Sequence, residues 1–187
     1  MQRNIHEEFL ERVKDKAKNW MPGDPLDPAT PMGPMIDAAQ CRTVAAYVDI
    51  GIEEGAELVF GGGQVLQSSG GHYHQPSIFA GVNNAMRIAQ EEIFGPVLSI
   101  IAYKDEEEAI RIANDSPYGL AGAVWSGDEA RAQKVARRIR AGQVDVNGGA
   151  FNMNAPFGGF KQSGHGREAG VYGLEEFLEY KSLQLKG

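Results

Sequence analysis

The sequence predicts an α/β fold, built as a layered, mostly parallel sheet with flanking helices. Strand and helix patterns alternate across residues 97–147, in the order strand, helix, strand, helix, strand, which is typical of parallel sheets. Hydrophobic residues make up 42% of the chain and charged residues 23%, so an ordinary buried core is expected. A chain of 187 residues is long enough for one sizeable domain and short for two.

Two amphipathic helices are expected at the start of the chain. Residues 6–19 carry apolar side chains at three- and four-residue spacing, which indicates one helical face. Residues 22–34 hold five prolines and two glycines and should form a surface loop, because proline lacks the backbone donor that helices and central strands need. Asp37 is expected to cap a second helix that runs to about Glu54, because a carboxylate can accept a free N–H at a helix start.

The strands and helices of the sheet follow. Short strands are predicted at residues 57–60, 120–125 and 143–147, and a buried strand at residues 97–103, which are apolar and β-branched. Asp105 should begin a helix over residues 106–114. Ser126 and Glu129 have the spacing of a capping box for a helix over residues 128–140, and Gly142 is well placed for its C-cap.

The last third of the chain contains a long irregular segment. Residues 148–173 hold eight glycines with little periodicity, and loops of this length in compact domains are usually functional. The loop follows a strand, so it should leave from the carboxyl end of that strand, where open α/β sheets place ligands. Residues 180–185 alternate in polarity and predict a terminal strand.

Composition excludes several classes of function. The net charge of −7 argues against a nucleic-acid partner, because phosphate binding needs clustered Lys and Arg. No apolar run approaches the ~20 residues that a membrane span needs. Cys41 is the single cysteine, so an intramolecular disulfide is excluded and a reducing compartment is favoured. With no apolar signal at the N-terminus, a cytoplasmic protein is expected.

Several motifs in order resemble one enzyme family. They are E-E-I-F-G-P-V at residues 91–97, N-D-S-P-Y-G at residues 114–119 and P-F-G-G-F-K-Q-S-G-H-G-R at residues 156–167. With these motifs the chain resembles the C-terminal part of the aldehyde dehydrogenase superfamily. The resemblance implies that residues 1–175 are the C-terminal portion of a catalytic domain and that residues 176–187 form an oligomerisation tail.

The resemblance also implies site residues. In this family the residues matching Glu92 and Phe94 contact NAD or NADP. A carboxylate can accept hydrogen bonds from both ribose hydroxyls, and an aromatic face can lie against the nicotinamide. Binding by this chain alone is expected to be weak or absent, because the sites for the adenosine and the pyrophosphate would lie upstream. Phe151 and Phe157 fall in the loop that walls the aldehyde tunnel of similar enzymes. From the residues alone, Phe94 could instead be core, Glu92 could cap a turn, and Phe151 and Phe157 could anchor their loop.

The family's catalytic groups are not found among these residues. The resemblance places the nucleophilic cysteine, the general base and the dinucleotide-binding domain before Met1, and Cys41 is expected to be an inert, buried thiol. The chain is therefore expected to be a C-terminal fragment of an enzyme that oxidises an aldehyde to a carboxylic acid, and to be inactive alone. The alternatives are a non-catalytic module that binds itself or full-length relatives, and an enzyme that uses Cys41.

Self-association is the expected partnership. The alternating residues 180–185 would expose an unpaired strand edge, which favours pairing with another chain, and a symmetric dimer is the simplest closed outcome. Arg167 and Glu179 are candidates for charges that fix this contact. No metal site is predicted, because His72 and His74 have no evident third ligand.

Overall fold

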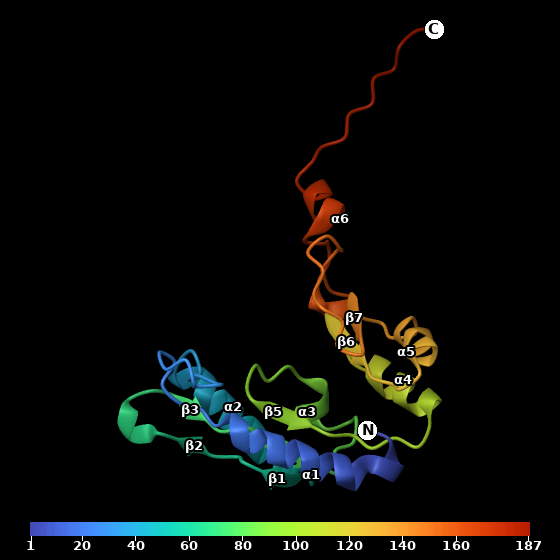
Figure 1. The fold of residues 1–187 in the computed structure, drawn as a ribbon. Helices are drawn as coiled ribbons and strands as arrows, with labels where there is room; N and C mark the ends of the chain where they lie inside the picture. The colour runs from blue at the N-terminus through green and yellow to red at the C-terminus, as the bar shows by residue number, and fades with distance from the viewer. The chain divides into compact units, whose positions relative to one another are not determined.

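The computed structural model describes residues 1–187, which form two compact units, residues 1–109 and residues 110–187. The helix α4 (Glu106–Asn114) runs from the first unit into the second. Helices and sheets occur in both units, so the α/β prediction is confirmed (Figure 1). The strands of residues 97–147 belong to two separate sheets, and the chain has antiparallel as well as parallel strand pairs. None of the helices combines the length and the apolar character needed to cross a membrane.

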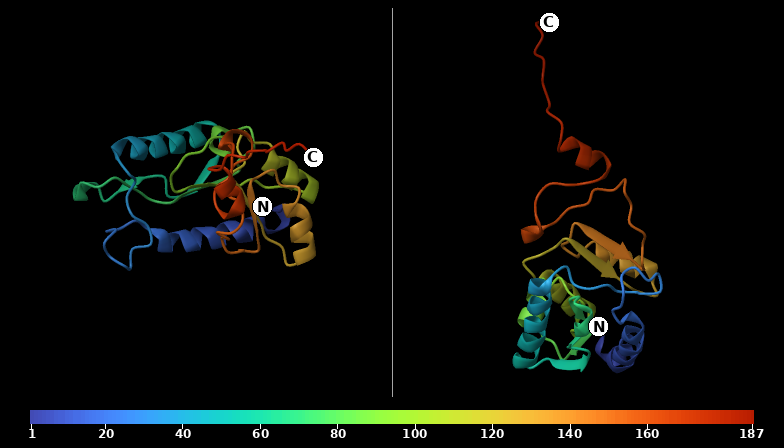
Figure 2. Two further views of the ribbon diagram at one scale, coloured as in Figure 1. Left: turned by 90° about the horizontal axis from the view of Figure 1, so that it is seen from above. Right: turned by 90° about the vertical axis from the view of Figure 1, so that its left-hand side faces the viewer.

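The first unit is a three-stranded sheet between two helices. The central strand β4 (Ser77–Ala80) pairs antiparallel with β1 (Glu57–Phe60) and parallel with β5 (Val97–Ser99). The helices are α1 (His6–Ala17) and α2 (Ala38–Glu53), and they lie on opposite sides of the sheet (Figure 2). A smaller antiparallel ribbon joins β2 (Gln64–Val65) to β3 (Tyr73–His74).

The alternation of side chains along β4 explains this layering. Phe79 packs in one cluster with Val48 of α2, whereas Ile78 and Ala80 pack in another with Leu10 of α1. Successive residues of a strand point to opposite faces, so a strand buried on both faces needs apolar side chains on each. All four residues of β4 are buried.

The second unit contains a βαβ motif. Strand β6 (Ala121–Val124) pairs in parallel with β7 (Gln143–Val146), and α5 (Glu129–Ala136) connects them. After β7 the chain forms a long loop, interrupted by a short 3₁₀ turn at Lys161–Ser163, and then α6 (Gly170–Glu175). The predicted glycine-rich loop therefore does leave from the carboxyl end of a strand.

The helix starts at Asp37 and Asp105 are confirmed. The Asp37 carboxylate accepts a hydrogen bond of 2.7 Å from the backbone N–H of Gln40. The Asp105 carboxylate accepts one of 2.9 Å from the backbone N–H of Glu108. Each bond satisfies one of the free donors at a helix N-terminus.

Several expected boundaries were wrong. Helix α5 is capped by Asp128 rather than Ser126, and it ends at Ala136, not at residue 140. Gly142 is therefore no helix cap; a Cβ there would collide with the carbonyl oxygen of Gly158, so this glycine allows two chain segments to approach closely. Strand β5 ends at Ser99, before the predicted residue 103.

The predicted terminal strand over residues 180–185 does not form within this chain. These residues lie in an extended segment that has no strand partner. Sequence patterns also missed β4, the most buried strand, and α3 (Arg87–Gln90), a single turn that precedes the loop described next.

Candidate functional site

A short loop, residues 91–96, connects α3 to β5 in the first unit, and we call it the 91–96 loop. It borders a cavity of about 340 Å³. The loop begins at Glu91, where the backbone turns extended after α3, and ends at Pro96, whose carbonyl accepts the N–H of Ser77 at 2.8 Å. The cavity is lined by Ile88, Glu91, Glu92, Ile93, Phe94, Gly95, Val97 and Ser99.

Phe94 is displayed at the tip of the 91–96 loop. Its side chain is 79% exposed, so the alternative that Phe94 belongs to the core is wrong. Its φ of 52° lies in the left-handed region, which a bulky residue adopts only under constraint. Part of that constraint is Gln40 of α2, whose side-chain amide donates to the carbonyls of Ile93 at 2.8 Å and Phe94 at 3.0 Å.

Glu91 and Glu92 are adjacent carboxylates with different surroundings. Glu91 accepts two hydrogen bonds from the Arg87 guanidinium, at 2.8 and 2.9 Å, and a third from the Tyr47 hydroxyl at 2.5 Å. The bonds from Arg87, and then that from Tyr47, lower the pKa of Glu91 to about 2. The Glu92 side chain is exposed and accepts no hydrogen bond from the chain, so it caps no turn.

Gly95 lets the 91–96 loop lie directly on α2. A Cβ at this position would run into Cγ2 of Val44, a residue with 0% exposure. The backbone of Gly95 is not in the left-handed region, so the requirement for glycine here is one of space alone.

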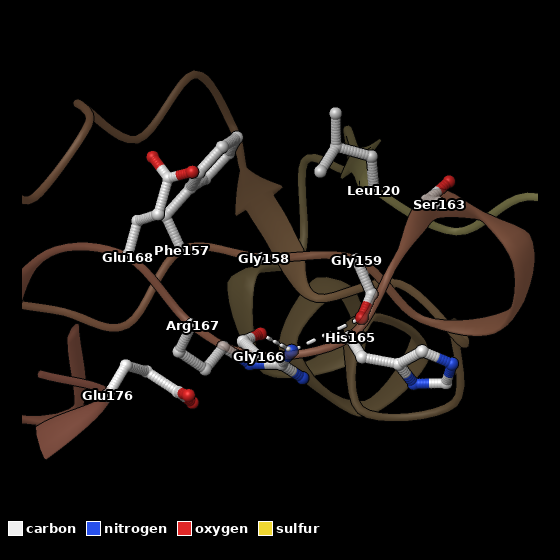
Figure 3. A pocket seen from close by; sticks show the side chains of 10 residues that line it. All are labelled: Leu120, Phe157, Gly158, Gly159, Ser163, His165, Gly166, Arg167, Glu168 and Glu176. Atoms are coloured by element: carbon white, nitrogen blue, oxygen red, sulfur yellow. Dashed lines mark hydrogen bonds between the residues drawn. The ribbon is translucent and has the colours of Figure 1, made fainter.

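The aromatic pair expected in the second unit is also brought together. The rings of Phe151 and Phe157 meet edge to face, with centroids 5.7 Å apart and planes at 70°. Phe151 is half exposed, whereas Phe157 is partly buried and exchanges two backbone hydrogen bonds with Glu168. Phe157 also lines a cavity of about 310 Å³ (Figure 3).

Arg167 fastens the loop in which it lies. Its guanidinium donates to the carbonyls of Gly159 at 3.2 Å and Gly166 at 2.6 Å (Figure 3), and it lies 5.4 Å from the centre of the Phe160 ring. These contacts occupy N–H donors of the guanidinium that was expected to face a second subunit. Glu179 is exposed.

Two further side chains of reactive type, Cys41 and His74, are buried. Cys41 is 3% exposed, and burial raises the pKa of its thiol, which disfavours the nucleophilic thiolate. His74 is fully buried, with Nδ1 2.8 Å from the carbonyl oxygen of Gln75. The structure brings together no group of three or more His, Cys, Asp or Glu that could hold a metal ion.

The sequence patterns missed four residues whose contacts support the 91–96 loop: Gln40, Tyr47, Arg87 and Glu91. The spacing of Arg87 and Glu91 at i and i+4 was a usable signal, because such pairs meet on a helix surface. Gln40 and Tyr47 gave no local signal, since their partners lie more than 40 residues away.

The chain is similar to several proteins of known sequence and structure. An aldehyde dehydrogenase homologue of Staphylococcus saprophyticus is 52% identical over 96% of the chain. Among solved structures, a P. syringae indole-3-acetaldehyde dehydrogenase in complex with NAD+ is 52% identical over 97% of the chain, with a TM-score of 0.94. A Mycobacterium tuberculosis aldehyde dehydrogenase complexed with NAD+ is 48% identical over 99% of the chain, with a TM-score of 0.96.

The chain spans 37–38% of the length of these three relatives. The family model described as "Aldehyde dehydrogenase family" matches residues 1–183, nearly the whole chain. The motifs at residues 91–97, 114–119 and 156–167 lie inside this match. The chain therefore belongs to the aldehyde dehydrogenase family, of whose members it represents a part.

Proposed function

We propose that this chain is the C-terminal part of an NAD(P)-dependent aldehyde dehydrogenase, an enzyme that oxidises an aldehyde to a carboxylic acid. In that enzyme its residues would contact the nicotinamide end of the cofactor, line the substrate pocket and bind another subunit. One observation carries the proposal: the 91–96 loop displays an exposed aromatic ring and an exposed, unpaired carboxylate beside one cavity.

Glu92 and Phe94 are the proposed cofactor contacts. A free carboxylate such as that of Glu92 can accept two hydrogen bonds from the hydroxyls of one ribose. The Phe94 ring is exposed and so accessible to the flat nicotinamide, and covering its apolar surface removes that surface from water, which favours the contact. When bound, NAD or NADP supplies the hydride acceptor for the oxidation.

Phe151 and Phe157 are the proposed aromatic wall of the aldehyde pocket. Their edge-to-face packing holds both rings in a fixed orientation on an otherwise irregular loop. A wall of this kind favours aldehydes with an apolar body. The P. syringae relative is named for an indole-3-acetaldehyde substrate, which fits that class.

The chain alone is proposed to be inactive. Thiol-dependent oxidation of an aldehyde needs an accessible thiolate, and the one thiol of this chain is buried with a raised pKa. Aldehyde oxidation would then require residues beyond these 187. The single Cys41 also fits the reducing conditions of the cytoplasm, because it has no disulfide partner within the chain.

The tail is proposed to join subunits. We assign residues 1–175 to the catalytic domain and residues 176–187 to an oligomerisation tail that forms a homodimer. Exposed apolar side chains concentrate in this tail and in α6 just before it, and surfaces of this kind usually mark a protein contact. They are Val171, Tyr172, Leu174, Phe177, Leu178, Tyr180, Leu183 and Leu185.

NMR titration with NAD tests the cofactor proposal directly. In the ¹⁵N-labelled chain, millimolar NAD should shift the amide signals of residues 91–95, and the shifts should be much smaller in Glu92→Ala. Glu57→Ala, which removes an exposed carboxylate from β1, is the control and should titrate like the parent chain. Shifts spread evenly over the chain, or absent from the loop, would refute the assignment and favour the non-catalytic interaction module.

A turnover assay tests the proposed inactivity. The purified chain, mixed with NAD or NADP and aromatic or aliphatic aldehydes, should produce no reduced cofactor by absorbance. Turnover that disappears in Cys41→Ser would show that this thiol is catalytic after all.

A further inference from the structure

The strained conformation of Phe94 needs explaining by what surrounds it. A bulky residue with φ of 52° persists only where the neighbouring structure over-determines it, since the conformation costs of order 1–3 kcal/mol. Phe94 is exposed, so burial of its own side chain does not supply that constraint. The constraint must therefore come from contacts at the ends of the 91–96 loop and from the contacts of its backbone with α2.

The strongest such contact lies at the start of the loop. Tyr47, Arg87 and Glu91 form a closed triangle, which we call the Glu91 clamp. Arg87 grips both carboxylate oxygens of Glu91, the Tyr47 hydroxyl binds one of them, and the Arg87 guanidinium lies 5.5 Å from the centre of the Tyr47 ring. Three different interactions thus fix one carboxylate between α2 and α3.

Fixing Glu91 also fixes the direction of its neighbour. Glu91 has an extended backbone, with φ of −106° and ψ of 145°. Consecutive side chains on an extended backbone point to opposite sides. The Glu91 clamp holds Glu91 toward α2, whereas the neighbouring Glu92 side chain is exposed, so the two adjacent carboxylates face different surroundings.

The Glu91 clamp also leaves the carboxylates of Glu91 and Glu92 in different electrostatic surroundings. Arg87 neutralises Glu91, and the low pKa of Glu91 reflects that pairing. Glu92 is left as the one unpaired carboxylate of the 91–96 loop, free to accept hydrogen bonds from a ligand. Without Arg87 the loop would present two adjacent negative charges, which disfavours a cofactor that carries phosphates.

From this geometry we infer that Tyr47 and Arg87 are positioning residues for the nicotinamide cofactor, acting through Glu91 to aim Glu92 and Phe94. The inference rests on the proposed cofactor contacts of Glu92 and Phe94. Neither Tyr47 nor Arg87 lines the cavity beside the loop, so their effect on binding would be indirect.

Tyr47→Phe is the most selective test. It removes the hydroxyl that binds Glu91 but keeps the ring beneath Arg87. The bond lost lies within the chain and not to the cofactor, so NAD binding should weaken about threefold to tenfold, less than the full contribution of a hydrogen bond to a charged group. Tyr103→Phe is the matched control, because Tyr103 lies in the same unit and its hydroxyl makes no hydrogen bond.

Arg87→Lys and Arg87→Ala provide a second pair. The Arg87 side chain is half exposed, so both variants should fold. Lysine keeps the charge but cannot form the two-pronged bond, so Arg87→Lys should retain part of the affinity that Arg87→Ala loses. Arg87→Met fills similar space without a charge, so recovery by lysine but not by methionine would separate neutralisation of Glu91 from simple filling of space.

Two readouts on the full chain decide the outcome: the NAD dissociation constant from the NMR titration, and hydrogen exchange of the amides of residues 92–95. Faster exchange together with weaker binding in Tyr47→Phe, but not in Tyr103→Phe, is the expected result. Faster exchange with unchanged affinity would overturn the inference, because the clamp would then stabilise the loop without serving the cofactor. If NAD shifts no loop signal even in the parent chain, it is the proposed function that fails, and the inference with it.

Discussion

Gly95→Ala should destabilise the first unit through a single steric collision. The added Cβ would meet Cγ2 of Val44 and lie 3.1 Å from its Cγ1. Val44 has 0% exposure and lies on α2, so it cannot swing into solvent to make room. Backbone strain is not involved, because Gly95 does not occupy the left-handed region.

The magnitude follows from the packing. Forcing an extra methyl group into a full core typically costs 1–3 kcal/mol, and we expect about 2 kcal/mol here. Val44→Ala should by itself cost about 2 kcal/mol, from two lost methyl groups and the cavity they leave. In the double variant the methyl group added by Gly95→Ala enters the space that Val44 vacates, so the total should be about 2 kcal/mol rather than the additive value of about 4 kcal/mol.

Urea unfolding monitored by fluorescence provides the assay. The chain has two tryptophans, Trp20 in the first unit and Trp125 in the second, so a Trp125→Phe background leaves Trp20 as a reporter of the first unit. Gly33→Ala is the matched control in the same unit. Its added Cβ would meet only Cβ of Pro25 at 3.5 Å, an ordinary contact, and its backbone is not left-handed, so it should change stability by less than about 0.5 kcal/mol.

Additivity is the result that would refute this reasoning. If the double variant loses the sum of the two single losses to within about 0.5 kcal/mol, the two positions do not share one space. A Gly95→Ala variant as stable as Gly33→Ala would equally show that the 91–96 loop can move away from α2 without cost.

Three further predictions concern the thiol, the clamp and the tail. Cys41 should react with a thiol reagent in absorbance assays far more slowly in the folded chain than in urea; equal rates would contradict its burial. The folded pKa of Glu91 is about 2 against an ordinary 4.5, so the contribution of the Glu91 carboxylate to folding stability is complete above about pH 5 and is lost as the pH falls toward 2. The difference in unfolding free energy between the parent chain and Glu91→Gln should therefore shrink over that range. A difference that does not depend on pH would show that the charge of Glu91 is not its cause. Deleting residues 180–187 should turn a dimer into a monomer by light scattering, and an unchanged mass would clear the tail of that role.

Local sequence signals located the elements that depend on neighbouring residues. Apolar spacing placed α1 and α2, and the carboxylates of Asp37 and Asp105 marked true helix starts, because each caps a donor only three residues away. The central strand β4 was missed, because a short strand buried on both faces has no alternation of polar and apolar residues to reveal it. Its identity depends on two helices that lie elsewhere in the chain.

The tail shows the opposite failure. Alternation over residues 180–185 is a genuine strand pattern, yet no strand forms there within the chain. A strand needs a partner for its backbone donors and acceptors, and a sequence pattern specifies the face that is buried without specifying the partner. Strand formation by this segment therefore depends on a pairing edge that the single chain does not offer it.

The two glutamates of the 91–96 loop show a difference that local sequence patterns cannot predict. In the sequence Glu91 and Glu92 are identical neighbours, and only the family resemblance singled out Glu92. The structure separates them through Tyr47 and Arg87: one carboxylate is paired three times over and the other is left free. Because Tyr47 lies 44 residues before its partner, no window of local sequence contains this division. Ligand-binding capacity at the 91–96 loop thus arises from tertiary contacts that occupy one acid and leave its neighbour available.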